Sequence, residues 1–252
     1  MLENQVRKRL DSGSPALSAW MVEPSSIIAE ALALENFAAV TVDLQHGGVD
    51  ADSLVPLFQA LAVHDMTPFV RVPWNEPGVI ARVLDAGALG IICPMVNNRR
   101  DCEQFVSSAR YSPLGSRSYG PHRASIAYGP EYAAQANDVV ITLAMIETVE
   151  AFENLDEILD VPGLDGVFVG PSDLSQSMGL RAAPDWVDGP VLDRIESILA
   201  RVTARGKIAG ISTNSAEYAR RMAKSGFAFI TVSSDLGFIQ HGAREALRVF
   251  HS

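Results

Sequence analysis

The chain has 252 residues, of which 48% are hydrophobic, 20% charged and 7% aromatic. This length fits one (β/α)8 barrel or two small domains. The composition excludes a disordered chain, a collagen-like repeat and a disulfide-stabilised miniprotein. Thirty acidic against twenty basic residues give a net charge of −10. Because proteins that bind nucleic acids carry basic surfaces, this charge argues against a nucleic-acid partner.

The N-terminal segment and the two cysteines predict a cytoplasmic protein. No apolar run follows the basic residues 7–9, so we expect no secretory signal. No stretch approaches 18 uninterrupted apolar residues, so we expect no membrane contact. Cys93 and Cys102 fit neither a redox pair nor a zinc knuckle, and two packed free thiols suit a reducing compartment.

Short β-branched runs alternate with stretches of helical periodicity along the whole chain. Several of the runs are apolar throughout, as is typical of parallel strands covered on both faces. Between them, positions such as Leu54, Leu57, Phe58 and Leu61 form one apolar stripe of a helix. The predicted strands are residues 17–22, 39–44, 68–72, 90–95, 139–146, 166–169, 208–213 and 227–232.

Eight strands alternating with helices predict an α/β protein, a (β/α)8 TIM barrel that spans residues 1–252 as one domain. The alternative is an open doubly wound sheet. The chain lacks both the GxGxxG and the GxxxxGK[ST] motif, so we expect no NAD. Residues 111–128 are predicted to form a long loop over one rim, and the last helix is expected at about 236–250.

Polar residues stand at the ends of several predicted strands, where barrel enzymes have their active sites. Each has an alternative interpretation. Asp173 and Glu147 suit the first turn of a helix, Arg71 suits an ion pair with Asp43, and His46 suits a structural role. Since four such alternatives would have to coincide on one rim, we favour a shared site. The strand-end residues are Trp20, Asp43, His46, Arg71, Glu147, Ser172 and Asp173.

Two of these carboxylates predict a metal site. Glu147 and Asp173 follow neighbouring strands, which lie about 4.8 Å apart, and would repel each other without a cation. Mg²⁺ or Mn²⁺ suits two carboxylates that leave room for a chelating substrate. Backbone N–H groups at the start of the next helix would bind a carboxylate beside it. A 2-oxo acid offers both kinds of group.

Lysine is scarce, which bears on the chemistry. Only Lys8, Lys207 and Lys224 occur, and none is predicted at the rim. Chemistry next to a carbonyl needs a lysine Schiff base or a polarising metal as electron sink. We therefore expect no Schiff-base lysine and no pyridoxal phosphate. Arg71 would stabilise an enolate, and His46 would move protons.

Five motifs combine these residues. They are Val-Asp-Leu-Gln-His (42–46), Val-Arg-Val-Pro-Trp-Asn (70–75), Tyr-Ser-Pro-Leu-Gly-Ser-Arg (111–117), Ile-Glu-Thr (146–148) and Gly-Val-Phe-Val-Gly-Pro-Ser-Asp-Leu-Ser (166–175). With them the chain resembles, over roughly residues 15–250, the metal-dependent (class II) pyruvate aldolases of the HpcH/HpaI family.

The resemblance implies an aldehyde-lyase of EC 4.1.2 type. Such an enzyme catalyses reversible aldol cleavage or addition between a 2-oxo acid and an aldehyde through an enolate, with Mg²⁺, Mn²⁺ or Co²⁺ bound. It implies that Glu147 and Asp173 are the metal ligands, His46 the base and Arg71 the stabiliser of the enolate. Backbone N–H groups of Ser172 and Asp173 would bind the donor carboxylate.

The family also places an acid at Asp85 that raises the basicity of His46. Asp85 ends a predicted helix that runs away from the rim, so whether it reaches His46, and from which subunit, stays open. Homohexamers in which the last helix packs on a partner are implied as well, and an apolar stripe from Ile239 to Phe250 permits this.

The chain departs from the family at two positions. Gln45 stands where relatives often have Glu, and Met145 stands where they often have Gln. With Met145 the chain lacks the side-chain amide that relatives have near the 2-oxo acid. Both pyruvate and hydroxypyruvate therefore remain candidate donors. Trp20 and Met145 are expected to contact the substrate. Arg123 and Ser125 are candidates for contacts with the aldehyde, with a solvated loop as the alternative.

Two other functions remain open. An acyl-CoA lyase of the citryl- or malyl-CoA type needs a basic surface for the nucleotide, which the charge of −10 does not favour. A non-catalytic barrel that binds 2-oxo acids would not need the combination of His46, Arg71, Glu147 and Asp173.

Overall fold

Eight parallel strands form a closed barrel in the computed structural model of the chain, which describes residues 2–252. Each strand pairs with the next, and the last pairs with the first. The predicted TIM barrel is therefore confirmed. The strands are β1 (Ala16–Met21), β2 (Ala39–Asp43), β3 (Thr67–Arg71), β4 (Gly90–Cys93), β5 (Ile141–Ile146), β6 (Gly166–Val169), β7 (Ile208–Thr213) and β8 (Phe229–Val232).

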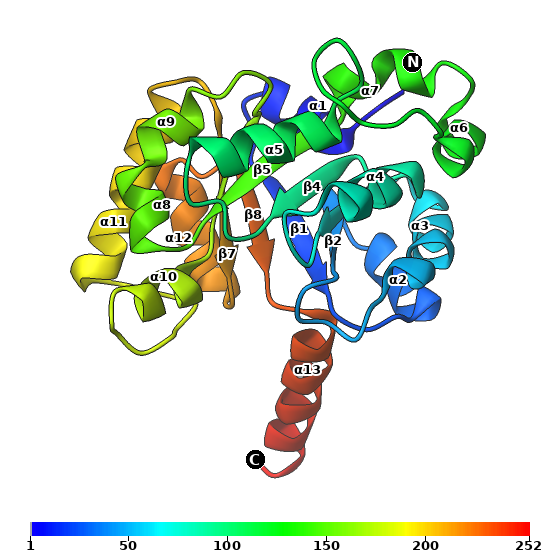
Figure 1. The fold of residues 1–252 in the computed structure, drawn as a ribbon. Coiled ribbons are helices and arrows are strands. Elements are labelled where there is room, and N and C mark those ends of the chain that lie inside the picture. Colours follow the sequence, from blue (N-terminus) through cyan, green and yellow to red (C-terminus); the bar gives the residue numbers. More distant parts are fainter. Residues whose placement is uncertain (1) are drawn as a thin grey trace.

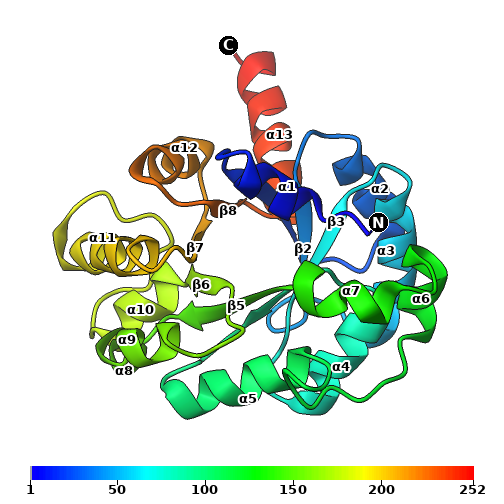
Figure 2. The same ribbon diagram turned by 90° about the horizontal axis from the view of Figure 1, so that it is seen from above.

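Helices surround the barrel in a ring that Figure 2 shows most plainly. Among residues 2–252, no helix is long and apolar enough to cross a membrane. The helices are α1 (Gln5–Asp11), α2 (Ser26–Ala33), η1 (Ala51–Ser53), α3 (Leu54–Ala62), α4 (Pro77–Asp85), α5 (Arg99–Ala109), α6 (His122–Tyr128), α7 (Tyr132–Val139), α8 (Val149–Glu153), α9 (Leu155–Leu159), α10 (Pro171–Ser177), α11 (Gly189–Thr203), α12 (Ala216–Ser225) and α13 (Asp235–Phe250).

Several predicted boundaries shift for local reasons. Val139 belongs to α7 and not to the fifth strand. The helix continues through Val139, and Val140 caps it before β5 begins at Ile141. β4 ends at Cys93, and Met95 then adopts a left-handed conformation with φ of 55°. Residues 111–128 are not all loop, since their last seven residues form α6.

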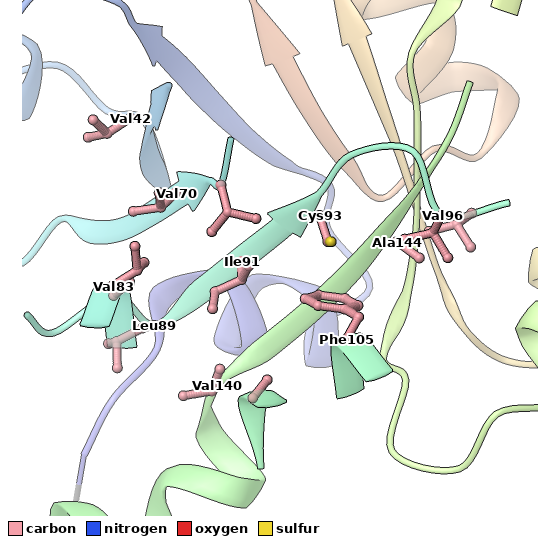
Figure 3. Close-up of a cluster of buried hydrophobic side chains, with 14 of the residues drawn as sticks. Val42, Val70, Val83, Leu89, Ile91, Cys93, Val96, Phe105, Val140 and Ala144 are labelled. Atoms are coloured by element: carbon pink, nitrogen blue, oxygen red, sulfur yellow. The ribbon is translucent and has the colours of Figure 1, made fainter. Parts of the chain in front are cut away.

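Apolar side chains fill the space between the strands and the helices. Figure 3 shows part of this layer, in which Val70 and Ile91 of two strands lie with Phe105 of α5. Cys93 and Cys102 are fully buried free thiols in the same layer, as expected of packed cysteines. Inside the barrel, the rings of Phe69 and Phe229 stack with centroids 4.6 Å apart.

The amino-terminal end of the barrel contains a buried ion cluster. The carboxylate of Asp165 accepts hydrogen bonds from Arg110 at 2.6 Å and from Arg7 at 2.7 Å. It also accepts from the backbone N–H and the hydroxyl of Thr142. This network joins α1 and α5 to β5 and to the turn before β6, and it therefore closes the end opposite the predicted active-site rim.

Helix α13 begins on the barrel and then projects away from it (Figure 1). The buried carboxylate of Asp235 accepts hydrogen bonds from the backbone N–H groups of Val22 and Glu23, which anchors the start of the helix. Farther along, Leu247 and Phe250 are 59% and 82% exposed. The predicted last helix is therefore present, with its apolar stripe open to the surroundings.

Candidate active site

A cavity of about 220 Å³ opens at the carboxyl-terminal ends of the strands. It brings together six of the residues predicted as a site, from loops and strands far apart in the sequence. The lining residues are Trp20, His46, Arg71, Met145, Phe168, Gly170, Pro171, Ser172, Asp173 and Ser212.

Arg71 is held by two neighbouring strand ends. Asp43 and Arg71 are directly paired in the β2–β3 register, and the guanidinium donates to the carboxylate from Nε at 2.9 Å and from Nη2 at 2.6 Å. The indole of Trp20 donates to the same carboxylate at 3.2 Å and lies beneath the guanidinium, 4.8 Å from its carbon. The expected ion pair thus exists, and it fixes Arg71 against the cavity.

Asp43 also orders the segment that carries His46. Its Oδ1 accepts from the backbone N–H of Gln45 at 3.0 Å and more weakly from that of His46 at 3.4 Å. Burial raises the pKa of Asp43, but hydrogen bonds and charge from Arg71 outweigh it and hold the pKa below its usual value. An ionised Asp43 therefore supports both the arginine and the turn that presents the imidazole.

Glu147 follows β5 and is 2% exposed. Its Oε1 accepts from the backbone N–H of Met95 at 2.8 Å. Thr148 caps α8, so Glu147 precedes this helix and is not the first-turn charge of the alternative interpretation. Burial above all, and then the charge of Asp173, raises the pKa of Glu147 to about 7. The charge of Asp173 thus acts in the direction expected of two neighbouring carboxylates.

Asp173 lies in the first turn of α10 and lines the cavity. No side chain caps this helix, so Asp173 is not its N-cap, but Asp173 does lie in the first turn, as its alternative interpretation expected. The backbone N–H groups of Ser172 and Asp173 belong to the first turn, whose N–H groups have no partner within a helix. Gly170 precedes them, and a Cβ atom there would lie 2.7 Å from Oε2 of Glu147. A side chain at this position would therefore displace the carboxylate of Glu147.

These carboxylates suit a hard divalent cation. Oε2 of Glu147 is free of the hydrogen bond made by Oε1 and faces the Gly170 backbone beside Asp173. Residues 2–252 contain no group of three or more His, Cys, Asp or Glu side chains arranged to hold a metal. Two carboxylate ligands with open coordination positions fit Mg²⁺ or Mn²⁺ and do not fit a closed zinc site.

Three predicted residues lie at the opposite end of the barrel within one chain. Asp85 ends α4 and forms a 2.7 Å ion pair with the buried side chain of Arg117. Arg123 donates to the carbonyl of Ala86 at 3.0 Å, and Ser125 lies on the same helix, α6. Because α6 packs against α4 near the start of β4, it does not overhang the cavity as a site loop would.

The lysines lie away from the cavity, as expected. Lys207 donates to the carbonyl of Leu164 at the amino-terminal end, and Lys8 and Lys224 belong to α1 and α12. None of the three lines the cavity.

Comparison with known proteins identifies the family. The profile of the HpcH/HpaI aldolase/citrate lyase family matches residues 18–242. The chain belongs to this family. Its resemblance to the HpcH/HpaI aldolases is confirmed, and so is the predicted reaction class, a carbon–carbon lyase of the aldolase type.

Two curated relatives and one solved structure of the HpcH/HpaI family illustrate the match. The chain is 43% identical over 244 residues to a hydroxypyruvate/pyruvate aldolase of Rhizorhabdus wittichii, covering 97% of each chain. It is 36% identical to a 4-hydroxy-2-oxo-heptane-1,7-dioate aldolase of Salmonella paratyphi B, covering 98% of this chain and 94% of the other. A family protein from Burkholderia cenocepacia J2315 superposes with a TM-score of 0.91 at 29% identity, covering 99% and 100%.

Sequence reasoning did not assign Phe168 and Ser212 to the site. Both line the cavity, from the middle of β6 and from the end of β7. The alternation of inward and outward positions along the strands is the signal that finds them. It also explains Met145, which faces inward two residues before Glu147, as expected.

Proposed function

We propose that this chain catalyses the reversible aldol reaction of a 2-oxo acid with an aldehyde, dependent on Mg²⁺ or Mn²⁺, with Co²⁺ as a further candidate. One observation carries the proposal: Asp173, Arg71 and His46 line one cavity, and the buried carboxylate of Glu147 lies against Gly170, which lines the same cavity. The names of the relatives from Rhizorhabdus and Salmonella support the same chemistry.

Glu147 and Asp173 would hold the cation. When bound, it supplies a Lewis acid that polarises the carbonyl of the 2-oxo acid and so provides the electron sink.

The residues of the chain supply orientation and proton movement. Backbone N–H groups of Ser172 and Asp173, at the positive end of α10, bind the donor carboxylate. Arg71, fixed by Asp43, places its positive charge where negative charge develops on the enolate oxygen. In the cleavage direction His46 accepts the proton of the 4-hydroxyl, the C3–C4 bond breaks, and the aldehyde leaves.

Both pyruvate and hydroxypyruvate remain donors in this proposal. Met145 presents a thioether and no amide to the cavity, next to the ring of Phe168. The ring of Trp20 stacks with that of Phe168 at a centroid distance of 6.2 Å, and its indole is oriented by Asp43. The resulting pocket for the carbon chain of the donor combines apolar walls with few polar side chains.

Asp85, Arg123 and Ser125 lie at the amino-terminal end of the barrel, so they would join an active site only in a second copy of the chain. We propose a homohexamer in which the exposed stripe of α13 packs on a neighbouring subunit. In this arrangement Asp85 of one copy would raise the basicity of His46 in the next, and Arg123 and Ser125 would contact the aldehyde there. The half-exposed carboxylate of Asp85 supports this role. The two buried free thiols support a cytoplasmic enzyme.

Proton exchange in D₂O tests the proposal without knowledge of the aldehyde. Metal-loaded protein incubated with pyruvate should exchange the methyl protons, because enolate formation at carbon 3 is reversible. The exchange is followed by proton NMR. A protein that binds pyruvate with metal but exchanges nothing would be a binding barrel and not an aldolase.

A further inference from the structure

Ser212 occupies an inward position at the open end of β7. Inward and outward side chains alternate along this strand, so Gly210 and Ser212 share the face that includes the interior residue Ile208. Ile211 pairs with Val169 in the β6–β7 register, which places Ser212 level with Gly170. Ser212 accordingly lines the same cavity as Ser172 and Arg71.

The hydroxyl of Ser212 is available to a ligand. Within residues 2–252 it has no hydrogen-bond partner, and the residue is half-buried. The next residue behaves differently, because the hydroxyl of Thr213 faces outward and donates to the carbonyl of Thr231 at 2.8 Å. The side chain of Ser212, in contrast, forms no hydrogen bond with a neighbouring strand among the described residues.

The other polar groups of the cavity already have partners or proposed roles. Arg71 is paired with Asp43, the carboxylates Glu147 and Asp173 suit a cation, and the first turn of α10 suits the donor carboxylate. On β6 and just beyond it, Phe168 and Gly170 place no polar side chain next to Ser212, and on β8 its register partner is the buried Thr231. Thr231 does not line the cavity, so Ser212 is the strand hydroxyl placed to recognise a polar substituent of the donor.

We propose that Ser212 selects a 2-oxo acid donor that carries a hydroxyl group on carbon 3, by forming a hydrogen bond with that hydroxyl. This inference rests on the proposed function and specifies its donor. When the donor lacks this hydroxyl, the half-buried Ser212 can form a hydrogen bond with water instead. Such donors are therefore disfavoured but still bind. The bond pairs two neutral hydroxyl groups, which sets its effect at about tenfold or less.

The test compares two donors in three proteins. We measure kcat/KM for hydroxypyruvate and for pyruvate with the same aldehyde and metal, in the wild type, in Ser212→Ala and in Ser212→Thr. Ser212→Ala should lower kcat/KM for hydroxypyruvate by about tenfold and leave that for pyruvate within about twofold. Ser212→Thr keeps the hydroxyl and should recover most of the preference, which separates the hydrogen bond from packing.

Two results would overturn the inference. An equal fall for both donors would place Ser212 against a part that they share, such as the carboxylate. An unchanged ratio in Ser212→Ala would show that the serine does not contact the substituent. Failure of the proposed function looks different, since wild-type protein would then exchange no protons of either donor in D₂O. In that case calorimetric titration of the metal-loaded wild type and Ser212→Ala with both acids still decides whether the serine recognises the hydroxyl.

Discussion

Asp43 accepts two hydrogen bonds from Arg71, one from Nε at 2.9 Å and one from Nη2 at 2.6 Å. This two-point contact fixes the plane of the guanidinium as well as its position. Because strand register already pairs the two residues, the barrel itself sets the direction in which the positive charge faces the cavity. The arginine therefore needs little rearrangement when negative charge develops on a bound substrate.

Replacing Arg71 by alanine should lower kcat by about 10²–10³, as expected for the loss of one group that stabilises a developing oxyanion. Arg71→Lys keeps the charge but cannot make both contacts with Asp43, so an intermediate loss is expected. Steady-state aldol kinetics measures both, and circular dichroism checks that the variants fold. Unchanged kinetics in Arg71→Ala would remove this residue from the mechanism.

The barrel and most of the cavity were predictable because they rest on local patterns. Apolar runs and helical stripes repeat eight times, and barrel geometry then gathers the strand ends that carry His46, Arg71, Glu147 and Asp173. The role of Ser212 was not predicted, because a single serine at a strand end has no distinctive pattern. It becomes visible only when strand register places it beside Gly170.

The segment at the amino-terminal end of the barrel was predicted less well. Residues 111–128 have the composition of a loop, yet α6 forms there and packs against α4. Composition did not reveal which rim the segment covers, since that depends on tertiary contacts such as the bond from Arg123 to Ala86. The proposed action of Asp85 on His46 has no counterpart within one chain, because Asp85 pairs with Arg117 at the opposite end of the barrel from the cavity.

Removal of divalent metal should abolish turnover. EDTA should stop both cleavage of a 4-hydroxy-2-oxo acid and methyl proton exchange of pyruvate, and Mg²⁺ or Mn²⁺ should restore both. The reason is that all three lysines lie away from the cavity, so a Schiff base has no nearby amine. Treatment with borohydride and pyruvate serves as the control and should leave activity intact. Activity that survives complete chelation would contradict the assignment of Glu147 and Asp173.

Metal affinity should depend on pH through Glu147. Burial raises the pKa of this carboxyl to about 7 in the metal-free protein, and a cation requires the ionised form. Affinity should therefore rise by about tenfold per pH unit below this pKa and level off above it. Calorimetric titration with Mn²⁺ between pH 5 and 8 measures the profile. An affinity that stays constant from pH 5 to 7 would show that Glu147 releases no proton on binding.

Asp165 should be important for stability and not for chemistry. Asp165→Asn leaves Arg110, whose side chain is 3% exposed, without its charged partner, and should cost about 3–5 kcal/mol in urea unfolding. The matched control is Asp156→Asn, which breaks two ion pairs of a 60% exposed carboxylate, with Arg201 and Arg205, and should cost about 1 kcal/mol or less. A loss in Asp165→Asn no larger than in this control would show that the buried cluster contributes little.

The effect of Asp165 should also depend on pH. Burial raises its pKa, but the charges of Arg110 and Arg7 outweigh burial and hold it below its usual value of about 3.8. A lowered pKa means that the contribution to stability is present above about 3.8 and is lost as the pH falls through the folded pKa. The difference in unfolding free energy between wild type and Asp165→Asn should therefore shrink below about pH 3.8.

Deletion of residues 239–252 should reduce the size of the assembly. The deletion keeps Asp235, whose hydrogen bonds to Val22 and Glu23 anchor the start of α13, and removes the exposed apolar residues beyond it. Because these side chains touch almost nothing in their own chain, the barrel should fold as before. Light scattering coupled to gel filtration should give a hexamer for the full chain and smaller species for the deletion.

Arg244→Ala, on the same helix, is the control that should leave the hexamer intact. If the deletion and the full chain elute with the same mass, α13 does not join subunits, and the proposed delivery of Asp85 to a neighbouring His46 loses its structural basis.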